Sequence, residues 1–542
     1  MIARYQYILR QGKPRVDIGM LRLDYCFNNQ MMSAAGEDAL YEHMFMRGNE
    51  GIYWKDTALQ NAGYTYDYFA PQLLLDTDCD GTVAPGGPGY QAIIVYQDML
   101  DVPSAKVLLD HAKAGVRVLF VNGVTEMLAM GVDRTYARAA AMTPFNDGRE
   151  AELADIVSQI KALPVCAEVD GPENALAALK KLGVEPRIRF DAANRNVLPF
   201  MREDGDVRYV YLYNCMYTET EPVSFKAEIL GEGTPYAISC WTGDVSPVGK
   251  YVSEGGRTVI DVTLNPGEAC MYALNMAEKP AAHVVETDAE LVRICGGKVF
   301  LGADKSGEYT AKMGCGCEKK VAISAPADIS IPEWTLSVES WDAGKKVEIT
   351  EDRGLGYVTK EVYFETDKTM LDAGKVGLAP WKDIAAIGPE VSGVGFYSAE
   401  FELPADWSDD NAAVFAMGSV CGSTSAVYVN GAKAPAVDFD RPEVDITALV
   451  RPGKNTIKVE VASTLTNRLI ARGYFKGIPQ AMGIIMSDPT VFGEGPGGEI
   501  EEKPEGGEGG FGDIMGAYFN LQPVDSGMTG SAVIRTYTFK EI

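Results

Sequence analysis

Two uninterrupted apolar runs with one amphipathic helix between them constrain the first third of this chain most strongly. YQAIIVYQ (90–97) and VRVLFVNG (116–123) are typical of strands buried on both faces of a parallel sheet. The segment between them, 104–115, carries apolar residues at helical spacing and ends at Gly115, which suits a helix C-cap. Strand, helix and strand joined by short links form a right-handed βαβ unit. The sequence therefore predicts a doubly wound α/β domain, which we place at 15–186.

The hydrophobic period changes to two after residue 187. RYVYLYNCMY (208–217) and TVIDVTL (258–264) alternate in the manner of half-buried strands, and turn motifs such as NPGE lie between such segments. We predict an antiparallel β-sandwich over 187–330. A second all-β domain is predicted over 331–542.

The second all-β region carries a strong hairpin signal at Asn430-Gly431, because both residues tolerate positive φ. The acidic, glycine-rich segment 493–512 has too few apolar residues to bury a core. We predict that it is a mobile loop inserted before the last strands.

The first fourteen residues predict a short helix, because Tyr5, Ile8 and Leu9 fall at helical spacing and Gly12 and Pro14 end the pattern. A lone helix at this place is expected to have no sheet of its own to cover. We interpret 1–14 as the remnant of a domain outside this chain, or as its docking element.

Composition excludes some functions. The formal net charge of -27 argues against nucleic-acid partners and anionic membrane surfaces, both of which need basic patches. No apolar run approaches the roughly 20 residues that cross a bilayer. Ten cysteines in 542 residues are too sparse for a disulfide scaffold, and residues 1–15 carry no secretory signal. These features predict a cytoplasmic protein that needs no cofactor.

Three segments carry a resemblance to a known family. RYQYILRQGKPRVDIGMLRL (4–23) with LQNAGYTYDYFAPQLL (59–74) is similar to the junction where a (β/α)8 glycosidase barrel ends and a glutamine-amidotransferase-like α/β domain begins. The segment 207–274 resembles the small β-domain of the same enzymes. SGVGFYSAEFELPADW (392–407), with the later VNG, DIT and PGKN motifs, resembles the galactose-binding-like jelly roll of family 106 rhamnosidases and family 2 β-glycosidases.

The resemblance implies the C-terminal portion of an α-L-rhamnosidase-like glycoside hydrolase of family 106. In that family the catalytic carboxylates lie in the (β/α)8 barrel, and no residue here matches them, so we expect none in this chain. The implied function is an accessory chain, C-terminal fragment or subunit that acts on plant or microbial glycans or glycosides together with a barrel subunit. The alternative is a stand-alone carbohydrate-binding or oligomerisation protein without catalysis, in which the partner is a second copy of the chain.

An aromatic and polar segment at 39–69 falls in the first β–α connection, which lies at the ligand-binding edge of α/β sheets. Its residues suit either of two roles, stacking on and hydrogen bonding to a sugar or packing against a partner, since aromatic loops are common at interfaces. The candidates are Glu42, His43, Arg47, Tyr53, Trp54 and Asp56.

A calcium site is one possibility that the sequence suggests. The first half of a calcium-loop pattern is present in Asp76, Asp78, Asp80 and Gly81. The pattern then fails, because Gly87 occupies the position that needs a bidentate carboxylate. A hairpin turn with solvated aspartates is the alternative.

Cys315-Gly-Cys317 offers half of a soft-metal site, although a tetrahedral site needs four ligands. In the last domain, sugar binding is one interpretation of Trp381, Trp407, Asp438 and Asp440, and a core-capping role for the two tryptophans is the other.

Overall fold

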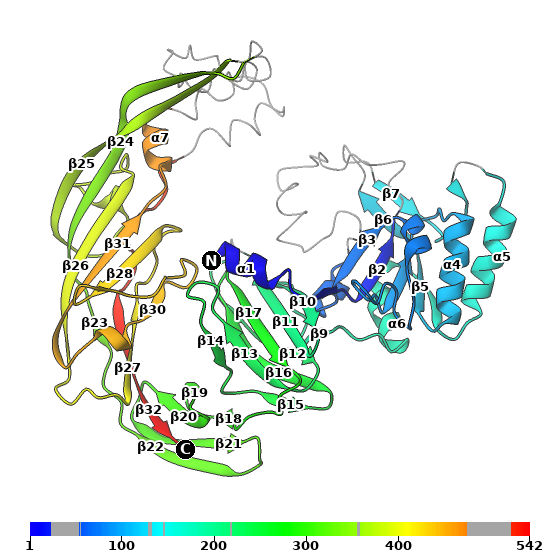
Figure 1. Ribbon diagram of the computed structural model, residues 1–542, viewed down its shortest axis with the longest axis horizontal. Coiled ribbons are helices and arrows are strands. Elements are labelled where there is room, and N and C mark those ends of the chain that lie inside the picture. The colour runs from blue at the N-terminus through cyan, green and yellow to red at the C-terminus, as the bar shows by residue number, and fades with distance from the viewer. Residues whose placement is uncertain are drawn as a thin grey trace. The chain divides into compact units, whose positions relative to one another are not determined.

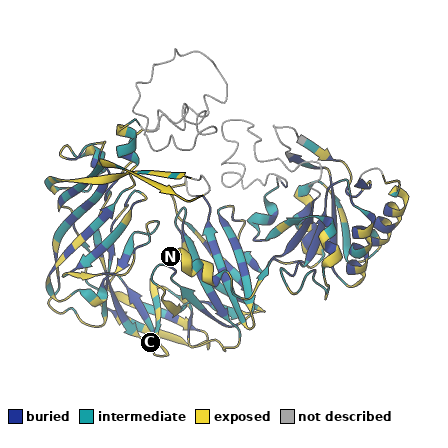
Figure 2. Ribbon diagram, turned by 45° about the horizontal axis from the view of Figure 1, so that its top comes forward, coloured by how far each residue is buried: buried dark blue, intermediate teal, exposed yellow. Residues whose placement is uncertain are grey.

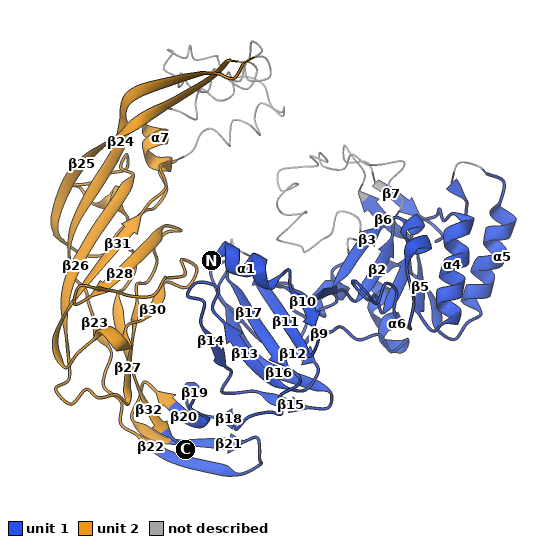
Figure 3. Cartoon of the chain, viewed as in Figure 1, with its two compact units in different colours: residues 1–301, 309–321, 541–542 blue, residues 302–308, 322–540 orange. Residues whose placement is uncertain are grey.

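The structure is a computed structural model that describes residues 1–22, 54, 56–127, 133–144, 147–216, 219–354, 358–473 and 522–542. The chain forms two compact units, coloured separately in Figure 3. Unit 1 comprises 1–301, 309–321 and 541–542, and unit 2 comprises 302–308 and 322–540. This division does not mark the predicted boundary at 186, which stays a prediction. No helix in the described ranges is long and apolar enough to span a membrane.

A parallel five-stranded sheet in the order β3-β2-β4-β5-β8 forms the first part of unit 1. The strands are β2 (Ile18–Leu21), β3 (Tyr66–Phe69), β4 (Ala92–Val95), β5 (Arg117–Asn122) and β8 (Cys166–Asp170). Helices cover both faces: α4 (Val102–Lys113) and α5 (Glu150–Lys161), side by side in Figure 1, pack on one. The other carries α3 (Ala58–Asn61) and α6 (Ala175–Lys181). This is the doubly wound arrangement that the apolar runs predict.

Local sequence signals set the ends of α4. The Asp101 carboxylate accepts a hydrogen bond from the Ser104 backbone N–H at 2.9 Å, which caps the helix start, and Pro103 lies in its first turn. Gly115 follows the helix with a φ of 101°, which a side chain would strain. The remaining short elements of this part are η1 (Pro71–Asp76), β6 (Val124–Met127), β7 (Asp133–Tyr136) and η4 (Pro172–Asn174).

The second part of unit 1 is an antiparallel sandwich. Its sheets have the orders β1-β10-β11-β17-β13-β14 and β15-β16-β12-β9. Its strands are β1 (Lys13–Arg15), β9 (Ile188–Phe190), β10 (Val197–Asp204), β11 (Val207–Asn214), β12 (Val223–Leu230), β13 (Thr234–Ile238), β14 (Val245–Pro247), β15 (Val252–Glu254), β16 (Arg257–Leu264) and β17 (Ala269–Asn275). One core cluster joins the two sheets through alternating residues such as Val210 and Ile260.

The N-terminal helix α1 (Ile2–Ile8) corrects one expectation. Ile8 packs against Cys240 and Met271, and the Tyr5 ring meets Tyr211 edge-on with centroids 5.8 Å apart. The helix therefore does cover a sheet, the one formed by β11, β13 and β17. The idea that it has no sheet of its own is wrong, because β1 ties the N-terminus into this sheet. Its proposed role as a barrel remnant or dock stays a prediction.

Unit 1 also contains a small antiparallel sheet with the order β18-β21-β22. Its strands are β18 (Val284–Thr287), β21 (Gly307–Met313) and β22 (Glu318–Ile323), with β19 (Leu291–Cys295) and β20 (Lys298–Ala303) between them in the chain. Residues 314–317 form the turn between β21 and β22.

Unit 2 is a sandwich of the sheet β25-β24-β26-β31-β28-β29 and a second sheet containing β32, β27 and β30, with β23 beside β32. Its core draws residues such as Leu336 and Val459 from the first sheet and Phe415 and Ile534 from the second. The elements are β23 (Ile329–Ser330), β24 (Trp334–Asp352), β25 (Val358–Val376), η5 (Trp381–Asp383), β26 (Gly393–Leu403), β27 (Asn411–Ala416), β28 (Thr424–Val429), β29 (Ala432–Lys433), β30 (Glu443–Asp445), η6 (Thr447–Leu449), β31 (Gly453–Ala462), α7 (Thr466–Ala471) and β32 (Val533–Glu541).

The turn predicted at Asn430-Gly431 is present, with φ values of 51° and 84° that join β28 to β29. The strands β24 and β25 form a long hairpin whose distal part is mostly exposed, as Figure 2 shows. The loop predicted at 493–512 lies outside the described residues.

Candidate functional site

A buried polar cluster occupies the carboxyl edge of the parallel sheet, where α/β folds bind ligands. Glu126 on β6 is fully buried and accepts hydrogen bonds from the hydroxyl of Tyr96 and, at 2.7 Å, from that of Tyr136. Gln97 donates to the same carboxylate at 3.1 Å, and Arg22 Nε donates at 3.2 Å. Arg22, Tyr96 and Gln97 directly follow β2 and β4, so strand ends assemble the cluster.

Burial raises the pKa of Tyr96 well above its usual value, and the neighbouring Glu126 carboxylate raises it further. The same two causes raise the pKa of Tyr136. Both hydroxyls therefore stay protonated and keep donating to Glu126. With four donors around it, this carboxylate is held as an acceptor, and the arrangement favours a structural role over general acid–base chemistry.

Trp54 is the only candidate from the first β–α connection, besides Asp56, that lies within the described residues. Its side chain is fully buried and its ring meets Tyr96 edge-on, with centroids 5.7 Å apart. Its backbone N–H donates to the Tyr68 hydroxyl at 3.2 Å. Trp54 thus packs beside the Glu126 cluster, and sugar stacking by its indole gains no support from this position. Glu42, His43, Arg47 and Tyr53 lie outside the described residues.

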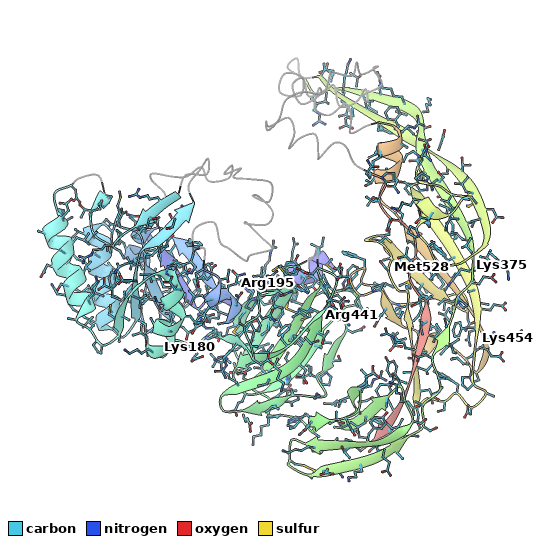
Figure 4. The ribbon with its side chains drawn as sticks, turned by 180° about the vertical axis from the view of Figure 1, so that it is seen from behind. Lys180, Arg195, Lys375, Arg441, Lys454 and Met528 are labelled. Carbon is cyan, nitrogen blue, oxygen red and sulfur yellow. A yellow bond between two sulfur atoms is a disulfide. The ribbon has the colours of Figure 1, made fainter. Side chains whose placement is uncertain are left out.

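Asp56 lies elsewhere, at the rim of a cavity of about 480 Å³ in unit 1. Its carboxylate accepts from the Ala58 backbone N–H at 2.9 Å and so helps to start α3. The cavity is lined by Asp56, Thr57, Ala58, Asn61, Ala62, Tyr64, Leu176, Lys180, Glu185, Pro186, Arg189, Phe190, Asp191, Ala192 and Ala193. Figure 4 labels Lys180, which lies on α6.

Arg189 forms ion pairs with Glu185 and Glu228 at this cavity. Arg189 binds the Glu228 carboxylate through Nε at 2.7 Å, and its Nη1 lies 3.6 Å from Glu185. Asp191 accepts from the Lys226 backbone N–H at 3.0 Å. The apolar part of the wall comes from alanines, Leu176 and Pro186. A neutral ligand suits such a wall better than a charged one, because a charged ligand would have to break these pairs.

Two buried amide atoms beside the cavity have no hydrogen-bond partner among the described residues. They are Asn61 Oδ1, an acceptor, and Asn194 Nδ2, a donor. The two residues are adjacent in space, since the Asn194 backbone N–H donates to the Asn61 carbonyl at 2.8 Å. A buried polar atom without a partner is costly and calls for a ligand or water. Asn61 lines the cavity, so a ligand hydroxyl there can donate to its amide oxygen.

The sugar-binding candidates of unit 2 are not gathered into one site. Trp381 is fully buried, and its indole N–H donates to the Tyr397 hydroxyl at 2.7 Å. Trp407 is half-buried against the core, and the Asp438 carboxylate accepts from the Asp440 backbone N–H at 2.9 Å in a local turn. For Trp381 this is the core-capping interpretation. Sugar binding through the other three stays a prediction.

The three aspartates proposed for calcium do not assemble. Asp76 ends η1, Asp78 is exposed, and Asp80 accepts from the Thr82 hydroxyl at 2.9 Å within a tight turn. Within the described ranges, no group of three or more His, Cys, Asp or Glu residues is placed to hold a metal ion. The calcium loop and the hairpin turn with solvated aspartates both stay predictions.

Comparison with known proteins gives a structural likeness without a sequence match. No protein-family model matches the chain, and no curated protein matches it. Among solved structures, a rhamnosidase from Novosphingobium sp. PP1Y is 18% identical with a TM-score of 0.53, covering 99% of this chain and 40% of that one. The chain therefore shares the fold of part of that rhamnosidase and spans about 40% of its length.

Two further structures are much less similar. An apo exo-carrageenase GH42 from Bacteroides ovatus is 13% identical, covering 41% of this chain and 26% of that one with a TM-score of 0.23. A GH42 β-galactosidase from G. stearothermophilus is 10% identical, covering 50% of this chain and 42% of that one with a TM-score of 0.26. Neither score is high enough to bear on the fold.

Proposed function

We propose that this chain is an accessory chain or C-terminal part of a rhamnosidase-like glycoside hydrolase of the family 106 type. The observation that carries the proposal is the likeness of nearly the whole chain to 40% of a rhamnosidase. In this proposal the catalytic carboxylates lie on a separate (β/α)8 barrel. Glycoside inversion needs two carboxyl groups about 6.5–9.5 Å apart, one of them free to protonate the leaving group. The Glu126 carboxylate, which accepts hydrogen bonds from four side chains, does not suit that task.

The test is a hydrolysis assay with an aryl α-L-rhamnoside. We expect the purified chain alone to release no aryl group above the buffer rate. Adding the polypeptide encoded directly upstream, if it forms a (β/α)8 barrel, is expected to give activity. Hydrolysis by the lone chain would contradict the division of labour, and so would an upstream polypeptide that is fully active without this chain.

A second candidate function, carbohydrate binding without catalysis, is favoured by the cavity beside Asp56 and Asn61. We propose that it takes one neutral sugar residue, one hydroxyl of which donates to Asn61 Oδ1 in the cavity wall. A cavity of about 480 Å³ lies within the usual range for small-molecule sites, roughly 300–1,000 Å³.

Calorimetric titration of the whole chain with L-rhamnose and D-galactose tests this second function. We expect saturable binding of at least one sugar, weakened roughly three- to tenfold by Asn61→Ala because one hydrogen bond is lost. Asn174→Ala is the matched control, since Asn174 is an exposed asparagine in unit 1 whose side-chain amide donates to the Asp170 carbonyl, away from the cavity lining. Equal weakening of sugar binding by both variants, or no binding of either sugar, would contradict sugar binding in this cavity.

A further inference from the structure

The turn between β21 and β22 carries a disulfide between Cys315 and Cys317, with one residue between them. Both cysteines are exposed. Gly316 stands between them with a φ of 81°. The turn is also held by backbone hydrogen bonds, from Gly316 N–H to the Met313 carbonyl at 2.8 Å and from Met313 N–H to the Cys317 carbonyl at 2.9 Å. The hairpin therefore does not depend on the sulfur–sulfur bond for its shape.

A structural role for this disulfide is poorly supported. The entropic stabilisation from a disulfide grows with the length of the loop that it closes, and this loop is close to the shortest possible. An exposed disulfide is also open to attack by thiols, and exposed disulfides are typically the labile ones. The bond between Cys315 and Cys317 is thus placed where it adds little to folding and where a thiol can reach it.

The other cysteines of unit 1 differ from this pair. Cys215 is buried, and burial raises the pKa of its thiol to about 11. Burial likewise raises the pKa of the Cys166 thiol to about 12. A thiol reacts as its thiolate, so these two side chains are poor nucleophiles at neutral pH. Cys295 is exposed but has no disulfide partner in the described structure.

A cleft of about 570 Å³ lies beside the disulfide, within unit 1, and Cys315 and Gly316 form part of its wall. His283 forms another part, and its ring stacks on Tyr251 with centroids 3.9 Å apart. A methyl group on Gly314 would lie 2.3 Å from His283 Cε1, so glycine at this position lets the imidazole lie directly against the turn. Lys312 and Glu254 also line the cleft, so its wall carries one charge of each sign.

We propose that Cys315 and Cys317 form a thiol–disulfide exchange site for a low-molecular-weight thiol of the glutathione type, which enters through this cleft. The cleft has the size of a small-molecule site. The opposite charges of Lys312 and Glu254 suit a zwitterionic thiol of this type, which carries carboxylates and an ammonium group. This activity is independent of glycoside chemistry and does not rest on the function proposed above.

The exchange balances as follows. A glutathione thiolate attacks one sulfur of the pair, forms a mixed disulfide, and expels the other cysteine as a thiolate, which takes up a proton. A second glutathione thiolate attacks the mixed disulfide and releases oxidised glutathione. Two electrons pass from two glutathione molecules to the cysteine pair, which ends as two thiols. Oxidised glutathione drives the same steps in reverse.

The experiment equilibrates the full chain in glutathione buffers of varied reduced-to-oxidised ratio, alkylates free thiols, and measures peptides by mass spectrometry. We expect the peptide with Cys315 and Cys317 to change from fully unalkylated to doubly alkylated across the accessible ratios, with little mixed disulfide, because each cysteine resolves the other. Cys315→Ser and Cys317→Ser should each accumulate the mixed disulfide on the remaining cysteine. Circular dichroism should be unchanged on reduction.

Two outcomes overturn the proposal. One is a pair that stays oxidised in a large excess of reduced glutathione, which identifies a bond resistant to this thiol. The other is a pair that stays fully alkylated in oxidised glutathione, which means that the disulfide does not form in this exchange. Cys295 is the control in the same samples. A mixed disulfide between Cys295 and glutathione shows that glutathione reaches an exposed cysteine of unit 1.

Discussion

Glu126→Ala is expected to destabilise the parallel-sheet part of unit 1 by about 3–5 kcal/mol, because it removes one member of a buried ion pair with Arg22. Arg22 and Glu126 are 4% and 0% exposed at the side chain, so water cannot replace the lost partner. Two tyrosine hydroxyls lose their acceptor at the same time. Domains are commonly stable by only about 5–15 kcal/mol. The expected loss is therefore a large share of the free energy of unfolding of this part.

Hydrogen exchange measured peptide by peptide suits this chain, since a protein of two units has no single unfolding transition. Peptides over β4 and β5 should exchange faster in Glu126→Ala, while peptides over β26 and β31 in unit 2 stay unchanged.

Tyr136→Phe, which removes one hydrogen bond to the carboxylate, should cost less, roughly 1.5–3 kcal/mol. Glu152→Gln is the control, because Glu152 is an exposed glutamate on α5. Unchanged exchange in Glu126→Ala would contradict a stabilising role for the cluster.

The sheet was predictable from sequence because its signals are local. A strand buried on both faces must be apolar throughout, and 90–97 and 116–123 satisfy that rule. The turn at Asn430-Gly431 was predictable for the same reason, since two successive positive φ values select those residues. The helix α5 also has a local signal, with Leu153, Ile156 and Ile160 buried at helical spacing, and it was missed.

The candidate sites depend on pairings over long sequence distances, which a single sequence does not display. Asn61 and Asn194 meet beside the cavity although 133 positions separate them in the numbering, 194 minus 61. The polar residues directly after β2 and β4 were a signal that could have been used, because strand ends of a parallel sheet share one edge. The packing of α1 on this sheet was missed because β1, which follows α1, pairs with β10 nearly two hundred positions away.

Trp381→Ala is expected to destabilise unit 2 by about 3–5 kcal/mol, the usual cost of removing a buried tryptophan side chain. The indole fills a space that two glycines leave open. A methyl group on Gly395 would lie 2.5 Å from its Cζ2, and one on Gly527 would lie 2.3 Å from its Nε1. The indole N–H also holds the Tyr397 hydroxyl, which in turn accepts from the Met528 backbone N–H at 3.1 Å; Figure 4 labels Met528. Trp381 thus joins β26 to the segment before β32.

The two interpretations of Trp381 predict opposite results for a conservative variant. If the side chain is part of the core, Trp381→Phe keeps most of the apolar contact, loses the hydrogen bond to Tyr397, and leaves any glycan binding of the folded protein unchanged. If the indole stacks on a sugar, the same variant weakens binding without a matching loss of stability.

Trp407→Ala is the control, because Trp407 is only half-buried against the same core and its loss should cost clearly less stability. Urea unfolding followed by exchange in unit 2 peptides, together with glycan-array binding, separates the two. Since the indole has 0% of its surface exposed, a sugar could reach it only if the segment at 526–528 moved away, and we expect the core result.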